Sequence, residues 1–98
     1  MNFQAIMKQA NQMKKDMEKA KKEIDETTFE VDNSFVHIRA KGNKKIESVK
    51  IDMESLEKDD IEILEDLIMV SINQLMDKID KETEKKMGKF TQGMPGLF

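Results

Sequence analysis

Apolar residues in the first quarter of the chain recur at the spacing of one helix face. Between residues 3 and 24 the intervals alternate between three and four residues, which is the a/d pattern of a coiled-coil seam. No glycine or proline interrupts the stretch, so the pattern predicts a helix about 30 Å long at 1.5 Å per residue. The seam is narrow and suits one facing helix; its members are Phe3, Ile6, Ala10, Met13, Met17, Ala20 and Ile24. Thr27 and Thr28, both β-branched, end the helical pattern.

Between residues 28 and 52 the period of the pattern changes from 3.5 to two. Three short stretches alternate apolar with polar side chains, and turn-forming residues separate them at 32–34 and 42–44. This predicts a three-stranded antiparallel meander with one apolar face. The second stretch places Val36, Ile38 and Ala40 on that face and turns His37 and Arg39 to the other.

The register of the last two strands follows from the apolar face. A two-residue turn at Asn43 and Lys44 sets Val36 against Ile51 and Ile38 against Val49. A turn centred one residue earlier would instead oppose Ile38 to Glu47. We therefore prefer the first register, which keeps the apolar residues together.

A longer helix is predicted after residue 59. Asp59 with Glu62 forms a capping-box arrangement. The apolar stripe that follows is wide as far as Ile79 and then thins to a seam, so the first half should cover the sheet. The second half should pair antiparallel with the opening helix as a projecting arm. The expected fold class is therefore α+β, with residues 1–92 as one domain and 93–98 as a flexible tail, because glycines and Pro95 stop the helix.

Composition excludes most catalytic and cofactor chemistry. The 98 residues include no cysteine, 4 glycines and one histidine, His37. No thiol site, disulfide framework, phosphate loop or His/Cys metal spacing can be assembled, and the acids between residues 52 and 66 lack the glycine and spacing of a calcium loop. We expect no catalytic residue, cofactor, metal or small-molecule substrate. No signal peptide or membrane span is predicted, so the expected class is a soluble intracellular protein.

Charge is sorted into blocks of opposite sign along the chain. The total is −3, but residues 1–22 carry six lysines against Asp16 and Glu18, a net +4. Residues 51–66 carry eight acids against Lys58, a net −7. Because salt screens charges within about 8–10 Å, the local field and not the total decides what each surface attracts.

The lysines of the first helix follow its heptads. Lys8, Lys15 and Lys22 recur every seven residues opposite the seam, with Lys14 and Lys21 on one side and Lys19 on the other. Seven helical residues advance about 10.5 Å, close to three base steps of about 3.4 Å. Such a ridge could contact phosphates without reading bases, although a merely solvated helix face has the same pattern. A second stripe at Lys78, Lys81, Lys85 and Lys89 is weaker, because Asp77, Asp80 and Glu84 lie alongside it.

Four short stretches, in order over nearly the whole chain, carry a family likeness. They are Met7-Lys8-Gln9-Ala10 with Gln12-Met13, then Val49-Lys50-Ile51-Asp52, then Leu64-Glu65-Asp66-Leu67 with Asn73, and finally Lys86-Met87 with Gly93-Met94-Pro95-Gly96. Each is unspecific alone, but the ordered set resembles the YbaB/EbfC family of bacterial nucleoid-associated proteins.

The resemblance implies an α-β-β-β-α protomer and a homodimer joined mainly through the sheet region, with helical arms that project like tweezers. It also implies a non-enzymatic protein of the cytoplasm, associated with the nucleoid. Such a protein would bind double-stranded DNA with little sequence preference and act in nucleoid organisation and gene regulation. The family's DNA contacts lie on basic residues of the arms. The matching positions are Lys8, Lys14 and Lys15, and the heptad phase extends them to Lys19, Lys21 and Lys22.

An alternative from another functional class stays open. Two helical arms on a β platform also suit a coiled-coil scaffold for partner proteins or a prefoldin-like holdase. Methionine-rich seams that separate at their ends could hold client chains. Suppression of client aggregation without DNA binding would favour this alternative.

Overall fold

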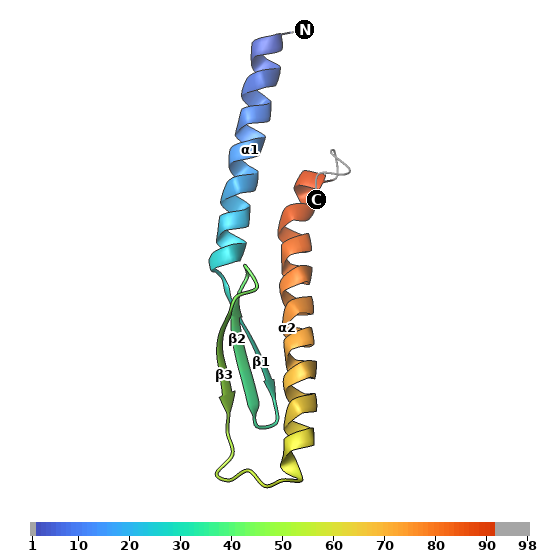
Figure 1. Cartoon of the computed structure of the whole chain (residues 1–98). Helices are drawn as coiled ribbons and strands as arrows, with labels where there is room; N and C mark the ends of the chain where they lie inside the picture. Colours follow the sequence, from blue (N-terminus) through green and yellow to red (C-terminus); the bar gives the residue numbers. More distant parts are fainter. Residues whose placement is uncertain (1, 92–98) are drawn as a thin grey trace.

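The structure, a computed structural model, describes residues 2–91, and the predicted α+β order is confirmed (Figure 1). A helix is followed by a three-stranded antiparallel sheet and then a longer helix. The elements are α1 (Phe3–Glu26), β1 (Thr28–Asn33), β2 (Val36–Lys41), β3 (Ile46–Ile51) and α2 (Asp60–Thr91). The molecule is a rod of 72 × 21 × 14 Å. The predicted flexible tail, residues 93–98, lies outside the described residues.

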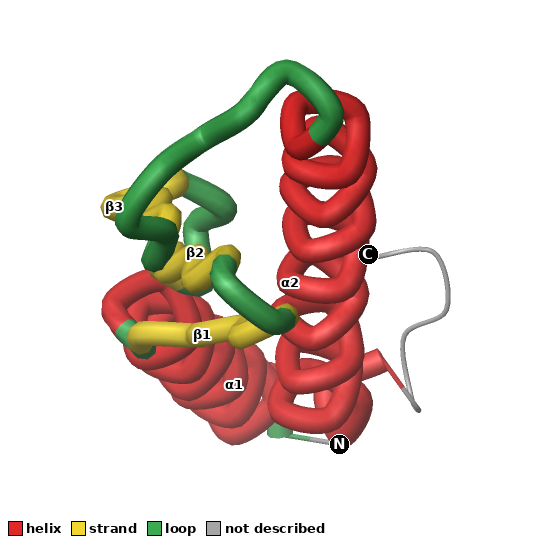
Figure 2. The backbone as a smooth tube through the Cα atoms, turned by 90° about the horizontal axis from the view of Figure 1, so that it is seen from below, coloured by secondary structure: helices red, strands yellow, loops and turns green. Residues whose placement is uncertain are grey.

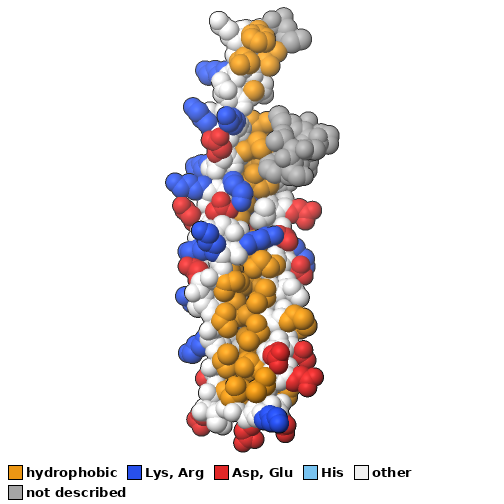
Figure 3. Space-filling model, viewed as in Figure 1, with side chains coloured by type: hydrophobic (Ala, Val, Ile, Leu, Met, Phe, Trp, Pro, Cys, Tyr) orange, Lys and Arg blue, Asp and Glu red, His pale blue; other side chains and the backbone are white. Residues whose placement is uncertain are grey.

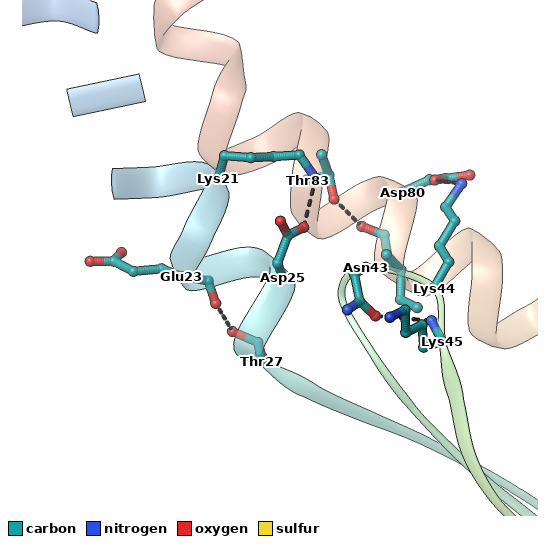
Figure 4. A network of polar contacts seen from close by, with 10 residues as sticks. Lys21, Glu23, Asp25, Thr27, Asn43, Lys44, Lys45, Asp80 and Thr83 are labelled. Carbon is teal, nitrogen blue, oxygen red and sulfur yellow. Dashed lines mark hydrogen bonds and ion pairs between the residues drawn. The ribbon is translucent and has the colours of Figure 1, made fainter. Parts of the chain in front are cut away.

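Side-chain caps fix both ends of α1. The Asn2 carboxamide oxygen accepts hydrogen bonds from the amides of Gln4 (3.1 Å) and Ala5 (3.4 Å), so two of the free amides of the first turn are satisfied. At the other end, the Thr27 hydroxyl donates to the Glu23 carbonyl at 2.6 Å (Figure 4). The helix therefore ends at Thr27, where the β-branched residues begin, as the sequence predicted.

The predicted register of β2 and β3 is confirmed, because Val36 pairs with Ile51 and Ile38 with Val49. The connection is longer than the predicted two-residue turn. It spans residues 42–45, so Asn43 and Lys44 are its middle pair, and Lys44 adopts a φ of 70°. A bulge between Arg39 and Ala40 places Ala40 opposite Ile46. The bulge keeps an apolar residue on the inner face where a regular ladder would have placed Glu47.

α2 covers the inner face of β1 and β2, as predicted for its first half (Figure 2). The Asn33 carboxamide on β1 donates to the hydroxyl of buried Ser71 and to the side-chain oxygen of Gln74, both at 2.8 Å. These bonds satisfy the buried hydroxyl and fix α2 along the edge of the sheet. The buried core comprises Phe29, Val36, Ile38, Ala40, Leu75 and Ile79.

The second helix begins one residue after the predicted cap. α2 starts at Asp60, and the Asp60 carboxylate accepts the amide of Glu57 at 3.0 Å. The carboxylate of Asp60 therefore closes the preceding turn, and Asp59 occupies the N-cap position that the sequence predicted. Asp60 and Glu62 also place negative charge in the first turn, where the helix dipole favours it.

The antiparallel pairing of the two helices in an arm is confirmed, over part of the predicted seam. Ile24 of α1 is buried with Met87 and Phe90 of α2, and Met13, Met17 and Ala20 pack against them. The first turns of α1 extend beyond the described end of α2 (Figure 1). Phe3 is consequently 72% exposed, and the seam has no cover there from the described residues.

Candidate nucleic-acid interface

All six lysines predicted from the heptad phase lie exposed on α1. The α1–α2 packing turns the seam inward, so the reverse of α1 carries Lys8, Lys15, Lys19 and Lys22. Figure 3 shows Lys and Arg side chains gathered along this outer side of the arm. We call these four residues the lysine ridge. None of them has an ion-pair partner within residues 2–91.

The other two predicted lysines lie on the flank of α1. Lys14 has no ion-pair partner among the described residues, but Lys21 donates to Asp25 at 2.6 Å (Figure 4). The spacing of this pair, i and i+4, is readable from the sequence. Because its ammonium is already bonded, Lys21 is less available to a polyanion than the ridge.

Neutral amide side chains lie between the ridge lysines, and the sequence analysis did not single them out. Lys8 and Lys15 line one shallow hollow of α1 together with Phe3, Gln4, Met7, Asn11 and Gln12. Carboxamide groups are common phosphate donors. Gln4 and Asn11 are seven residues apart, the same interval as Lys8 and Lys15. This shared interval is the sequence pattern from which the carboxamides could have been predicted.

One lysine of the second stripe reaches α1. Lys89 lines a hollow between the helices with Lys19, Asp16, Ala20 and Glu23, and its ammonium lies 5.0 Å from the centre of the Phe90 ring. Lys78 instead donates to the Glu30 carbonyl at 3.0 Å and holds α2 to β1. Asp80, one of the acids expected to weaken this stripe, forms an ion pair with Lys44 at 2.7 Å (Figure 4).

Two basic residues of the outer sheet face lie beside acids. Arg39 contacts Glu30 at 2.6 Å, and His37 Nδ1 lies 2.7 Å from an oxygen of Asp32. The β1–β2 register brings the two side chains together, because Asp32 lies directly opposite His37. Arg39 is therefore compensated at short range, whereas the four ridge lysines have no such partner within residues 2–91.

The acidic block lies at the opposite end of the rod from the ridge. Residues 51–66 form the end of β3, the following loop and the start of α2, far from the N-terminus of α1 (Figure 1). The rod is 72 Å long, several times the screening length of about 8–10 Å. The two fields therefore act independently at physiological salt.

An apolar surface on β3 and the facing side of α2, which we call the groove, is left uncovered. α2 packs on β1 and β2, while every residue of β3 is exposed. Hydrophobic side chains form a band along the sheet-bearing half of the rod (Figure 3). The exposed apolar residues on or beside β3 and α2 include Val49, Ile51, Leu56, Ile61 and Met69.

Within the described residues, neither helix is long and apolar enough to cross a bilayer. Comparison with known sequences gives consistent matches along the chain. The sequence pattern of the YbaB/EbfC DNA-binding family matches residues 1–94.

Relatives cover nearly the full chain. A nucleoid-associated protein of Ligilactobacillus salivarius is 37% identical over 99% of this chain and 95% of its own length. A nucleoid-associated protein of Oceanobacillus iheyensis is 41% identical over 99% of this chain and 97% of its own length. A nucleoid-associated protein of Enterococcus faecalis is 36% identical over 98% of this chain and 94% of its own length. These names indicate a nucleoid-associated DNA-binding protein and no known enzyme class. With this fold and these matches, the chain belongs to the YbaB/EbfC DNA-binding family.

Proposed function

We propose that this protein is a homodimer that binds duplex DNA mainly through its phosphates, and that it acts in nucleoid organisation and gene regulation. The observation that carries the proposal is the unpaired, exposed lysine ridge on the reverse of α1. The resemblance and the names of the relatives support the nucleoid role and a place in the cytoplasm.

Phosphate contact follows from the geometry of the ridge. Lys8, Lys15 and Lys22 repeat every 10.5 Å or so along a straight helix, close to three base steps. Lysine is a flexible point charge and reads no base edge by itself. The carboxamides of Gln4 and Asn11 beside the ridge add neutral donors to phosphate oxygens. The affinity for DNA should therefore come mainly from electrostatic attraction and depend little on the base sequence.

Dimerisation through the sheet region accounts for the uncovered groove. An edge strand that exposes Val49 and Ile51 beside the exposed Met69 is unfavourable in a monomer. A second copy would cover this groove and leave both arms free. A dimer also doubles the number of ridges available to one duplex.

The test is a mobility shift with a triple variant, Lys8→Glu, Lys15→Glu and Lys22→Glu. Binding of duplex DNA should be lost, because three positive charges per protomer become negative on the ridge, a change of six units, while the oligomeric state in sedimentation stays unchanged. The matched control is Lys45→Glu, Lys50→Glu and Lys58→Glu, which makes the same charge change off the arm and should retain most binding. Unchanged binding by the ridge variant would remove the ridge from the mechanism.

The holdase or scaffold alternative has one observation in its favour, the exposed apolar residues at the start of α1. Phe3, Ile6 and Met7 offer an adaptable surface to a client chain. Heat-denatured client protein separates the two functions: suppression of its aggregation by the ridge variant, which cannot bind DNA, would support the holdase.

A further inference from the structure

Two exposed surfaces at opposite ends of the rod each combine apolar side chains with charge, and the first shares Lys8 and Lys15 with the lysine ridge. The first, which we call the tip, is the hollow on α1 where Phe3 and Met7 lie beside Lys8 and Lys15. Phe3 is 72% exposed and Met7 48%. The tip is therefore an apolar surface bordered by positive charge.

The second surface, the foot, lies on the outer side of α2. Ile63 and Val70 are 53% and 42% exposed and, seven residues apart, share one helix face. Asp66 lies between them, and Glu62 precedes them by one residue. Neither carboxylate has an ion-pair partner within residues 2–91. The foot is therefore an apolar stripe bordered by negative charge.

The foot is separate from the groove assigned to the dimer. Val70 lies about 140° around the helix from Leu75, which is buried against the sheet. A partner covering β3 would approach the side of α2 that carries Met69, whereas Ile63 and Val70 point away from the sheet. An apolar pair on the outer side of a surface helix has no role in the protomer's own packing.

We propose that the tip of one molecule docks on the foot of another. The two surfaces match in apolar character and are opposite in charge, and the same chain supplies both. The rod is 72 Å long and rigidly packed between them, so a protomer cannot bring its own tip to its own foot. The contact joins unlike surfaces, and such head-to-tail contacts extend into rings or open arrays. Dimers would thereby assemble into larger units.

Cross-linking tests this pairing directly, because the protein contains no cysteine. Met7→Cys and Ile63→Cys are made as separate variants, one carrying a size tag, and mixed with a short thiol cross-linker in the absence of DNA. The expected product joins one copy of each variant. Ser48→Cys on the outer sheet face, mixed with Met7→Cys, is the control and should give background product only.

Three results would overturn the proposal: no mixed product above the control, Met7→Cys linking chiefly to itself, or Ile63→Cys linking chiefly to itself. The last would show that the foot belongs to a symmetric contact. Because the reaction contains no DNA, its failure leaves the mobility-shift result untouched.

A charge exchange provides a second, independent measurement. Lys8→Glu or Asp66→Lys alone should weaken association beyond the dimer about two- to fivefold in sedimentation, as expected for one exposed ion pair. The two variants mixed together should recover association, because the reversed tip then meets the reversed foot. Equal association by every variant and mixture would contradict the contact.

Discussion

The amide of Gly42 donates to the Thr27 carbonyl at 2.9 Å, and its backbone packs against the end of α1. A Cβ at this position would lie 1.8 Å from the carbonyl oxygen of Ile24. At the scale of single residues, this close approach joins the hairpin loop to the base of the arm. The position therefore requires glycine because of space, and Ile24 is in turn held in the arm's small core.

Gly42→Ala should lower the free energy of unfolding by about 1–3 kcal/mol, because backbone must move to admit the methyl group. Urea denaturation followed by circular dichroism measures the change. The control is Gly88→Ala, where an added Cβ meets no atom within 4 Å; there alanine should raise stability by up to about 1 kcal/mol through helix propensity. Equal stability of the Gly42 variant and the parent would show that the loop moves away freely.

At the scale of elements, β3 differs most from its neighbours. It pairs with β2 through backbone hydrogen bonds in the predicted register, yet α2 leaves its inner face uncovered. Its apolar residues therefore contribute little to the protomer's core. They are the part of the sheet that a second copy would bury under the proposed dimer.

Ile51→Lys should convert the proposed dimer to a monomer, because it places a charge in the groove that the partner would cover. Size-exclusion chromatography with light scattering measures the mass, and circular dichroism checks that the fold persists. Ser48→Lys, on the opposite face of the same strand, should leave the mass unchanged. A stable dimer of the Ile51 variant would place the interface elsewhere.

At the scale of the whole molecule, the length of the rod separates two fields of opposite sign. A protein with net charge −3 can present a positive arm because the acidic block lies several screening lengths away. Total charge is therefore a poor guide to partners when like charges gather at one end of an elongated fold.

The salt dependence of DNA binding should reflect the number of phosphates that the ridge lysines neutralise. Log affinity should fall linearly with log salt at about 0.9 per phosphate neutralised. Three or four ridge lysines in each protomer of a dimer give a slope of about −5 to −7 by the same rule. Fluorescence anisotropy of a labelled duplex at several salt concentrations measures it. A slope near zero would exclude phosphate contact as the main source of affinity.

The sequence by itself determined the elements, the strand register and the inward face of each helix. These follow from local periodicity and from keeping apolar residues on one face, so the alternation around Ile38 and the heptads of α1 were sufficient. It also contained the Lys21–Asp25 pair, whose spacing of four residues is a local signal.

Only the tertiary structure decided which charged side chains are paired and which apolar faces are left open. Asp32 lies beside His37, and Asp80 beside Lys44, because the chain reverses between them; the second pair joins residues far apart in sequence. Likewise, the width of α2 allows it to cover two strands and not the third. Which side chains pair and which faces stay exposed depends on how the helices and strands pack against one another. A local sequence pattern contains no information about that packing.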